Sequence, residues 1–308
     1  MTPRAPEILL LLIAMAVISC RRQDAIPTVS SEKPAQPVVY TVNYPLQYMA
    51  QRIGTGIVTV EFPAPADGDP AFWSPKPETI LAFQSADLVL LNGAGYAKWV
   101  ERVTLPQSRL VDTSRSFEKA YIAIPDSITH GHGPQGKHSH AGIEFTTWLD
   151  PSQAIDQARA IQAAFARLSP EQQQVFQENF RTLERDLLLL DKSLAEIVAR
   201  DPQKPLLASH PVYQYLARRY SLNLRSVHWE PEKMPAAPEW QELQEMLTPH
   251  PARWMLWEGV PREETVLKLR ALGIESIVYS PCATVPKQGD FLSVMEQNLK
   301  NLKAAFSK

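Results

Sequence analysis

The stretch SPEQQQVFQENFRTLERDLLLLDKSLAEIVAR, residues 169–200, decides the fold. Its opening Ser169-Pro170 is typical of a helix start, because serine caps exposed N–H groups and proline fits the first helical position. From Glu171 to Arg200 neither glycine nor proline occurs, and apolar residues recur near the helical period. The pattern predicts a rod of roughly thirty residues, about 45 Å long, that would hold the parts it joins nearly fixed.

On both sides of this rod, short apolar runs rich in β-forming residues alternate with amphipathic helical stretches. Such alternation predicts parallel sheets with right-handed crossovers. We therefore expect an α/β protein of two lobes, each with a four-stranded parallel sheet flanked by helices, joined by one long helix. The expected strands are 38–42, 58–62, 87–92 and 109–112 in the first lobe, and 205–210, 222–228, 254–258 and 276–280 in the second. The expected helices are 45–53, 76–85, 212–219, 240–247 and 263–272, with one from Asp150-Pro151 to about 167 before the rod.

The N-terminus has the layout of a lipoprotein signal peptide over residues 1–20. Arg4 supplies a positive charge, and the apolar run 8–18 is too short to span a bilayer. Ser19-Cys20 resembles a bacterial lipobox, in which Cys20 would be acylated and would anchor the chain to the membrane. An ordinary signal peptide with an incidental cysteine is the alternative. The lipobox predicts an exported chain held at the cell envelope, in the periplasm or on the outer face of the membrane.

Composition, charge and motifs predict the domain bounds and the broad functional class of the protein. They predict a flexible tether at 21–37, an N-terminal lobe at 38–168, the linking helix at 169–202 and a C-terminal lobe at 203–308. The net charge of −2 gives no reason to expect nucleic acid as a partner, and we expect a monomer. With Cys20 acylated, Cys282 has no partner for a disulfide. No Gly-x-Ser-x-Gly, phosphate-binding glycine loop or His-Glu-x-x-His motif occurs, so we do not expect an enzyme.

Six segments together resemble one known family, the zinc- and manganese-binding solute-binding proteins of bacterial ABC importers. The resemblance covers residues 38–306 and lies in the order and spacing of the motifs. It implies an exported component that captures zinc or manganese in the cleft between the lobes and delivers it to an importer permease. The segments are Asn43-Tyr44-Pro45-Leu46, Asp69-Pro70 with Trp73-Ser74-Pro75-Lys76-Pro77, Ala86-Asp87-Leu88-Val89-Leu90-Leu91-Asn92-Gly93, His130-Gly131-His132 to His138-Ser139-His140, Trp148-Leu149-Asp150-Pro151 and Ser209-His210-Pro211-Val212-Tyr213-Gln214-Tyr215.

The chain departs from the family at the metal ligands that the resemblance implies. The family holds its metal with three histidines and a carboxylate, each from a different segment. Here Ala71, Thr146 and Ser280 stand at three of these positions, and only His210 is retained. One imidazole cannot hold zinc, because closed zinc sites use four nitrogen, sulfur or oxygen donors.

Ligands in open α/β sheets bind outside the carboxyl ends of the strands, a rule that independently nominates His210 and Glu258. In a first interpretation the cleft binds metal through a rearranged set, in which Asp69, Glu258 or Cys282 joins His210. A cysteine thiolate would favour zinc over manganese. In another, the cleft is repurposed for a non-metal ligand or for none, and Trp73 and Trp148 line an aromatic pocket.

The histidine-rich loop 129–141 offers a further interpretation, compatible with either of these. His130 and His132 are two residues apart, as are His138 and His140, so an extended backbone places each pair on one face. The loop would then trap a transition metal through these four imidazoles. The alternative is a solvated loop without function. The other histidines, His228 and His250, are expected at the surface or in loops.

Overall fold

Two four-stranded parallel sheets frame the chain in the computed structural model, which describes residues 1, 36–124, 129–131, 137–139 and 142–307. The first has the strand order β2-β1-β3-β4 and the second β10-β9-β11-β12, so both follow the same topology. All eight predicted strands are present, each shorter than predicted, and this confirms the fold class. Their bounds are β1 Val38–Thr41, β2 Thr59–Glu61, β3 Leu88–Leu91, β4 Leu110–Asp112, β9 Leu206–Ala208, β10 Leu224–Ser226, β11 Trp254–Trp257 and β12 Glu275–Val278.

Helices cover the sheets, and polar side chains fix where several of them begin. The Asn43 side chain accepts a hydrogen bond from the Leu46 backbone N–H at 3.0 Å, and Asp150 accepts one from Ser152 at 3.0 Å. The α-helices are α1 Tyr44–Gly54, α2 Pro77–Ser85, α3 Pro151–Leu168, α5 Gln214–Tyr220, α6 Ala237–Leu247, α7 Glu263–Ala271 and α8 Phe291–Ala305. Short 3-10 turns are η1 Lys98–Arg102, η2 Gln107–Arg109, η3 Arg115–Ala120 and η5 Thr147–Leu149. Helix α8 was not among the predicted helices.

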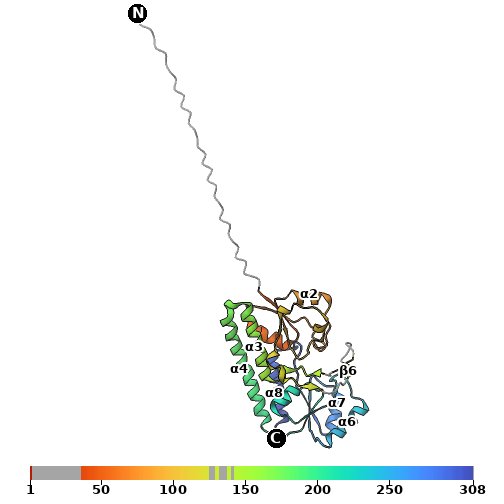
Figure 1. Cartoon of the computed structure of the whole chain (residues 1–308). Helices are drawn as coiled ribbons and strands as arrows, with labels where there is room; N and C mark the ends of the chain where they lie inside the picture. The colour runs from red at the N-terminus through yellow and green to blue at the C-terminus, as the bar shows by residue number, and fades with distance from the viewer. Residues whose placement is uncertain (2–35, 125–128, 132–136, 140–141, 308) are drawn as a thin grey trace. The chain divides into compact units, whose positions relative to one another are not determined.

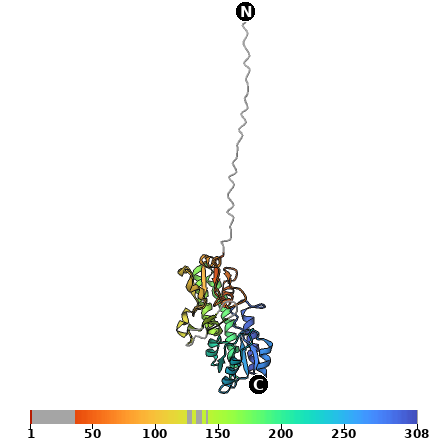
Figure 2. The same cartoon turned by 90° about the vertical axis from the view of Figure 1, so that its right-hand side faces the viewer.

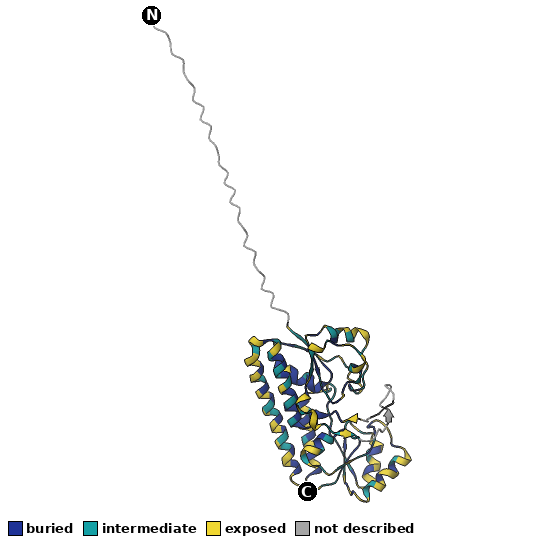
Figure 3. Cartoon of the chain, viewed as in Figure 1, coloured by how far each residue is buried: buried dark blue, intermediate teal, exposed yellow. Residues whose placement is uncertain are grey.

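The predicted rod is helix α4, Gln173–Val198, preceded by the 3-10 turn η6, Pro170–Gln172. Ser169 precedes this turn, but its side chain makes no capping hydrogen bond, so the predicted serine cap is wrong. One face of α4 is buried and the other is exposed along its whole length (Figure 3). The buried residues are Phe176, Phe180, Leu183, Leu187, Leu190, Leu194, Ile197 and Val198.

Helix α4 is fastened to both lobes, as expected of a linking helix (Figure 1). In its first half Asn179 donates to the Ile53 carbonyl of α1 at 3.0 Å. In its second half Asp191 accepts hydrogen bonds from Arg219 at 2.6 Å and from the Tyr220 hydroxyl at 2.7 Å, both on α5. Burial alone would raise the pKa of Asp191, but these hydrogen bonds outweigh it and leave that pKa lowered. The charged carboxylate therefore contributes to fastening α4 at neutral pH.

Residues 36–308 form one compact unit, in which the two sheets belong to an N-terminal and a C-terminal lobe stacked along α4 (Figures 1 and 2). The stacking is secured by direct contacts between the lobes. The Tyr44 N–H donates to the Ala283 carbonyl at 3.0 Å, and the Trp148 indole N–H donates to the Pro281 carbonyl at 2.8 Å. No helix in the described ranges is long and apolar enough to cross a membrane. Cys20 and the rest of the predicted signal peptide after Met1 lie outside those ranges, as does the predicted tether up to residue 35.

The histidine-rich loop 129–141 and the residues on either side of it form short strands that the sequence analysis did not predict. β5 Ala123–Ile124 pairs antiparallel with β8 Gly142–Ile143, and β6 Thr129–Gly131 pairs with β7 Lys137–Ser139. The register sets His130 opposite His138. Only the backbone of these two histidines is described, and His132 and His140 lie outside the described residues. The metal-binding role of all four stays a prediction.

Candidate functional site

A cavity of about 520 Å³ opens between the two lobes, on the side where the strands of both sheets end. Glu258 directly follows β11, and His210 lies two residues past β9. The position agrees with the strand-end rule that nominated both residues from the sequence. Its lining comprises Asp67, Gly68, Asp69, Pro70, Phe72, Tyr96, Phe145, Thr146, Trp148, His210, Val212, Glu230, Pro231, Glu232, Glu258, Gly259, Val260, Pro281, Ala283 and Thr284.

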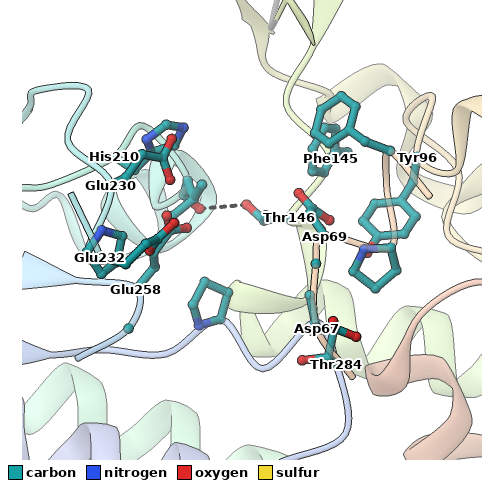
Figure 4. Close-up of a pocket in the computed structure, with 18 of the residues that line it drawn as sticks. Asp67, Asp69, Tyr96, Phe145, Thr146, His210, Glu230, Glu232, Glu258 and Thr284 are labelled. Carbon is teal, nitrogen blue, oxygen red and sulfur yellow. Dashed lines mark hydrogen bonds between the residues drawn. The ribbon is translucent and has the colours of Figure 1, made fainter. Parts of the chain in front are cut away.

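The wall from the C-terminal lobe combines one imidazole with carboxylates. Figure 4 shows His210, Glu230, Glu232 and Glu258 together on this side of the cavity. His210 is 1% exposed and Glu230 is 8% exposed, so both lie deep in the cavity and not at its mouth. The backbone N–H of Trp229 donates to the Ser209 carbonyl at 2.6 Å, which fixes the segment of Glu230 against that of His210.

A second histidine lies behind this wall. The His228 ring meets the His210 ring edge to face, with 5.8 Å between centroids and 81° between planes. Burial lowers the pKa of His228, while the charges of Glu242 and Glu230 act in the opposite direction. The imidazole next to His210 is therefore held in its neutral form at pH 7.

The wall from the N-terminal lobe is aromatic, with carboxylates at its edge (Figure 4). The Tyr96 ring meets Phe145 at 5.2 Å and Trp148 at 5.8 Å, edge to face in both cases. Asp69 accepts a hydrogen bond from the Ala71 N–H at 2.9 Å, which sets the direction of its loop.

The described lining residues include five carboxylates, from Asp67, Asp69, Glu230, Glu232 and Glu258, and neither a lysine nor an arginine is among them. A cleft lined by one sign of charge attracts the opposite ion. This cavity therefore favours a cation.

At the three positions that lack the family's ligand side chains, the residues present make packing contacts or hydrogen bonds within the protein. Ala71 is fully buried. The Thr146 hydroxyl lies 2.7 Å from the Glu144 carboxylate and 2.7 Å from the Val212 carbonyl, so it ties the lobes together. The Ser280 hydroxyl accepts the Cys282 N–H at 3.2 Å. None of the three brings an imidazole or a carboxylate into the cavity.

Glu144 is hydrogen-bonded to Thr146 and is 2% exposed. Its carboxylate accepts the N–H groups of Phe145 and Thr146, both at 3.0 Å, in addition to the Thr146 hydroxyl. Burial raises the pKa of Glu144 and outweighs these hydrogen bonds, which act to lower it. The residue fixes the bend that carries Phe145 and Thr146 to the cavity.

The structure brings four predicted site residues to the cavity: His210, Asp69, Glu258 and Trp148. Trp73 and Cys282 are not among the lining residues. Trp73 meets Trp99 at 6.3 Å inside its own lobe. Cys282 is 5% exposed, and burial, with a smaller contribution from the charge of Asp290, raises the pKa of its thiol to about 12. The Cys282 thiol is therefore protonated at neutral pH.

Sequence reasoning missed Glu230, Glu232 and Tyr96 as cavity residues. The sequence did indicate the two glutamates, because they follow the predicted strand 222–228 and ligands bind beyond the strand ends. His228 and His250 both lie in loops, as expected, but His250 is buried: it is 3% exposed, and its Nε2 lies 2.8 Å from the Leu206 carbonyl. Within the described part of the chain, no three His, Cys, Asp or Glu side chains are gathered so that they could hold an ion.

A family model described as "Zinc-uptake complex component A periplasmic", or ZnuA, matches residues 39–305. The chain belongs to this family.

Individual relatives are distant in sequence. The zinc-binding lipoprotein AdcA of Streptococcus pneumoniae serotype 4 is 23% identical over 276 residues, which cover 86% of this chain and 55% of AdcA. The high-affinity zinc uptake system protein ZnuA of Bacillus subtilis is 23% identical over 284 residues, covering 86% of each protein. The chain thus spans about half the length of AdcA and most of the length of the Bacillus protein.

Solved structures share the fold. The metal-dependent lipoprotein YcdH of Bacillus subtilis superposes with a TM-score of 0.75 at 21% identity, covering 88% of this chain and 99% of YcdH. The Zn(II)-bound ZnuA-like domain of Streptococcus pneumoniae AdcA superposes with a TM-score of 0.74 at 21% identity, covering 89% of this chain and all of that domain.

Proposed function

We propose that this chain is the extracytoplasmic solute-binding component of a zinc ABC importer. It captures zinc in the cleft between its lobes and delivers the ion to a membrane permease, and it performs no catalysis. The observation that carries the proposal is the family match over 39–305, joined to a cleft whose described lining presents an imidazole among carboxylates and neither lysine nor arginine. Relatives named for zinc binding support zinc over manganese as the cargo.

Within the cleft, we infer that His210 is the imidazole ligand and that carboxylates complete the set. Glu258 from the same lobe and Asp69 from the opposite lobe are the proposed partners, since all three line the cavity. Among the described residues these side chains are not gathered around one point, so the proposal requires that they draw together when zinc binds. Carboxylate oxygens bind zinc at nearly the same distance as imidazole nitrogens, so this exchange of donors is chemically sound. The histidine-rich loop, with His130, His132, His138 and His140, acts as an outer trap that raises zinc concentration near the cleft.

Zinc titration of the chain from residue 36 to 308 tests the function, because these residues form one compact unit. We expect saturable binding, and we expect one zinc ion per chain to remain bound after residues 129–141 are deleted. The second result distinguishes the cleft from the loop. A protein that binds no zinc in this titration contradicts the proposed function.

We infer further that Cys20 is acylated and holds the chain at the cell envelope as a monomer. Export places the cleft where free zinc is encountered, and the anchor keeps the chain near its permease. Replacing Cys20 by serine removes the acylated thiol, so the mature protein should move from the membrane fraction to the soluble fraction. Retention of the Cys20→Ser chain in membranes contradicts the anchor, and a second copy seen by light scattering contradicts the monomer.

A further inference from the structure

The hydroxyl of Tyr96 stands out in the cavity lining because it is buried without a hydrogen-bond partner. Other buried tyrosines have one: the Tyr213 hydroxyl donates to the Tyr279 carbonyl at 2.7 Å, and that of Tyr215 to the Glu144 carbonyl at 2.9 Å. Burying a polar group without a partner is costly, and a phenylalanine would pack the same ring without that cost. The buried hydroxyl of Tyr96 therefore indicates a hydrogen-bonding role that a phenylalanine could not fill.

The backbone that carries Tyr96 is itself in an unfavourable conformation. Four of the five residues from Gly93 to Ala97 have positive φ, and two of these four are alanines, Ala94 at 52° and Ala97 at 50°. Residues with a Cβ avoid this region for steric reasons. The segment is fixed by a hydrogen bond from the Tyr96 N–H to the Gly93 carbonyl at 3.0 Å. Strain of this kind persists where a side chain must be held in one place.

Asp69 is the acidic residue whose charge acts on the Tyr96 phenol. The Lys98 N–H donates to the Ala71 carbonyl at 3.1 Å, so the loop that carries Asp69 is fastened to the segment that carries Tyr96. Both side chains belong to the same wall of the cavity in Figure 4, opposite His210. Burial, and to a smaller extent the charge of Asp69, raises the pKa of Tyr96 well above its usual value. The phenol is therefore neutral and can donate one hydrogen bond.

We propose that Tyr96 is the positioning residue for the ligand contributed by the N-terminal lobe. When zinc enters, its hydroxyl donates a hydrogen bond to one oxygen of Asp69 and holds the other oxygen toward His210. Asp69 then supplies the donor that the N-terminal lobe lacks at Ala71. This inference rests on the proposed zinc-binding function and adds to it the residue that orients a ligand, as outer hydrogen bonds do in other metal sites.

Tyr96→Phe in the chain of residues 36–308 tests the inference. We expect zinc affinity to fall about tenfold, the effect of losing one hydrogen bond to a charged group. Without zinc, the melting temperature should stay unchanged or rise by about 2 °C, because a buried hydroxyl without a partner has been removed. A residue that only supports the fold would instead lower both quantities together.

A double-mutant cycle with Asp69→Asn identifies the acceptor. If Tyr96 acts through Asp69, Tyr96→Phe causes no further loss of affinity in the Asp69→Asn background. Tyr40→Phe is the matched control, since Tyr40 packs on Phe83 at 4.8 Å, outside the cavity lining, and should leave affinity unchanged. Wild-type affinity in Tyr96→Phe, or losses that simply add, overturns the inference. Absence of zinc binding by the wild-type chain would overturn the proposed function instead.

Discussion

Replacing His210 by alanine is expected to weaken zinc binding in the cleft at least a hundredfold. His210 supplies the only imidazole among the described lining residues, and every other charged side chain there offers oxygen. Loss of a hydrogen bond behind a metal ligand already costs about tenfold to a hundredfold in affinity, so loss of the ligand itself should cost more. The measurement is zinc affinity by competition with a chelator of known strength, in the chain that lacks residues 129–141.

Deleting the loop is necessary for this measurement because its four histidines could hold zinc by themselves and mask the loss. His250→Gln is the matched control: its Nε2 contacts the Leu206 carbonyl in the core of the C-terminal lobe. That variant should melt at a lower temperature and keep its zinc affinity. If His210→Ala binds zinc as tightly as the parent chain, the cleft is not the zinc site.

The fold was predictable because its signals are local. The apolar runs that became β9 and β11 are buried strands, and the unbroken helical period from residue 171 onward became α4. Details that depend on distant contacts were missed. The strands β5 and β8 have two residues each and exist only by pairing with one another across the histidine-rich segment. No window of sequence predicts such a pair.

The sequence indicates cavity residues most directly where a side chain immediately follows a strand, and less directly where a loop intervenes. Glu258 follows β11 without an intervening bend. Glu230 lies four residues past β10 and reaches the cavity because its segment is hydrogen-bonded to Ser209, a contact between two loops. Cys282 lies just as far past its strand, four residues beyond the end of β12, but its backbone adopts a φ of 58° and its thiol is buried away from the lining.

Replacing Trp148 by alanine should strongly reduce the stability of the protein. It is 2% exposed, its ring packs on Tyr96, and its indole N–H donates to the Pro281 carbonyl of the other lobe at 2.8 Å. Trp148→Ala leaves a large cavity and removes this bond between the lobes. We expect a loss of about 3–5 kcal/mol in the free energy of unfolding, and a melting temperature lower by about 10 °C.

Two further variants separate packing from the bond between the lobes. Trp148→Phe removes the indole N–H and the five-membered ring but keeps a buried six-membered ring, so it should cost less than Trp148→Ala. Trp73→Ala removes a partly exposed tryptophan whose ring contact with Trp99 lies within one lobe, and it should cost less than Trp148→Ala. Because α4 holds both lobes as well, Trp148→Ala should still unfold in a single transition, as followed by calorimetry. Two separate transitions would mean that Trp148, rather than α4, couples the lobes, and a melting temperature within about 2 °C of wild type would contradict its predicted role.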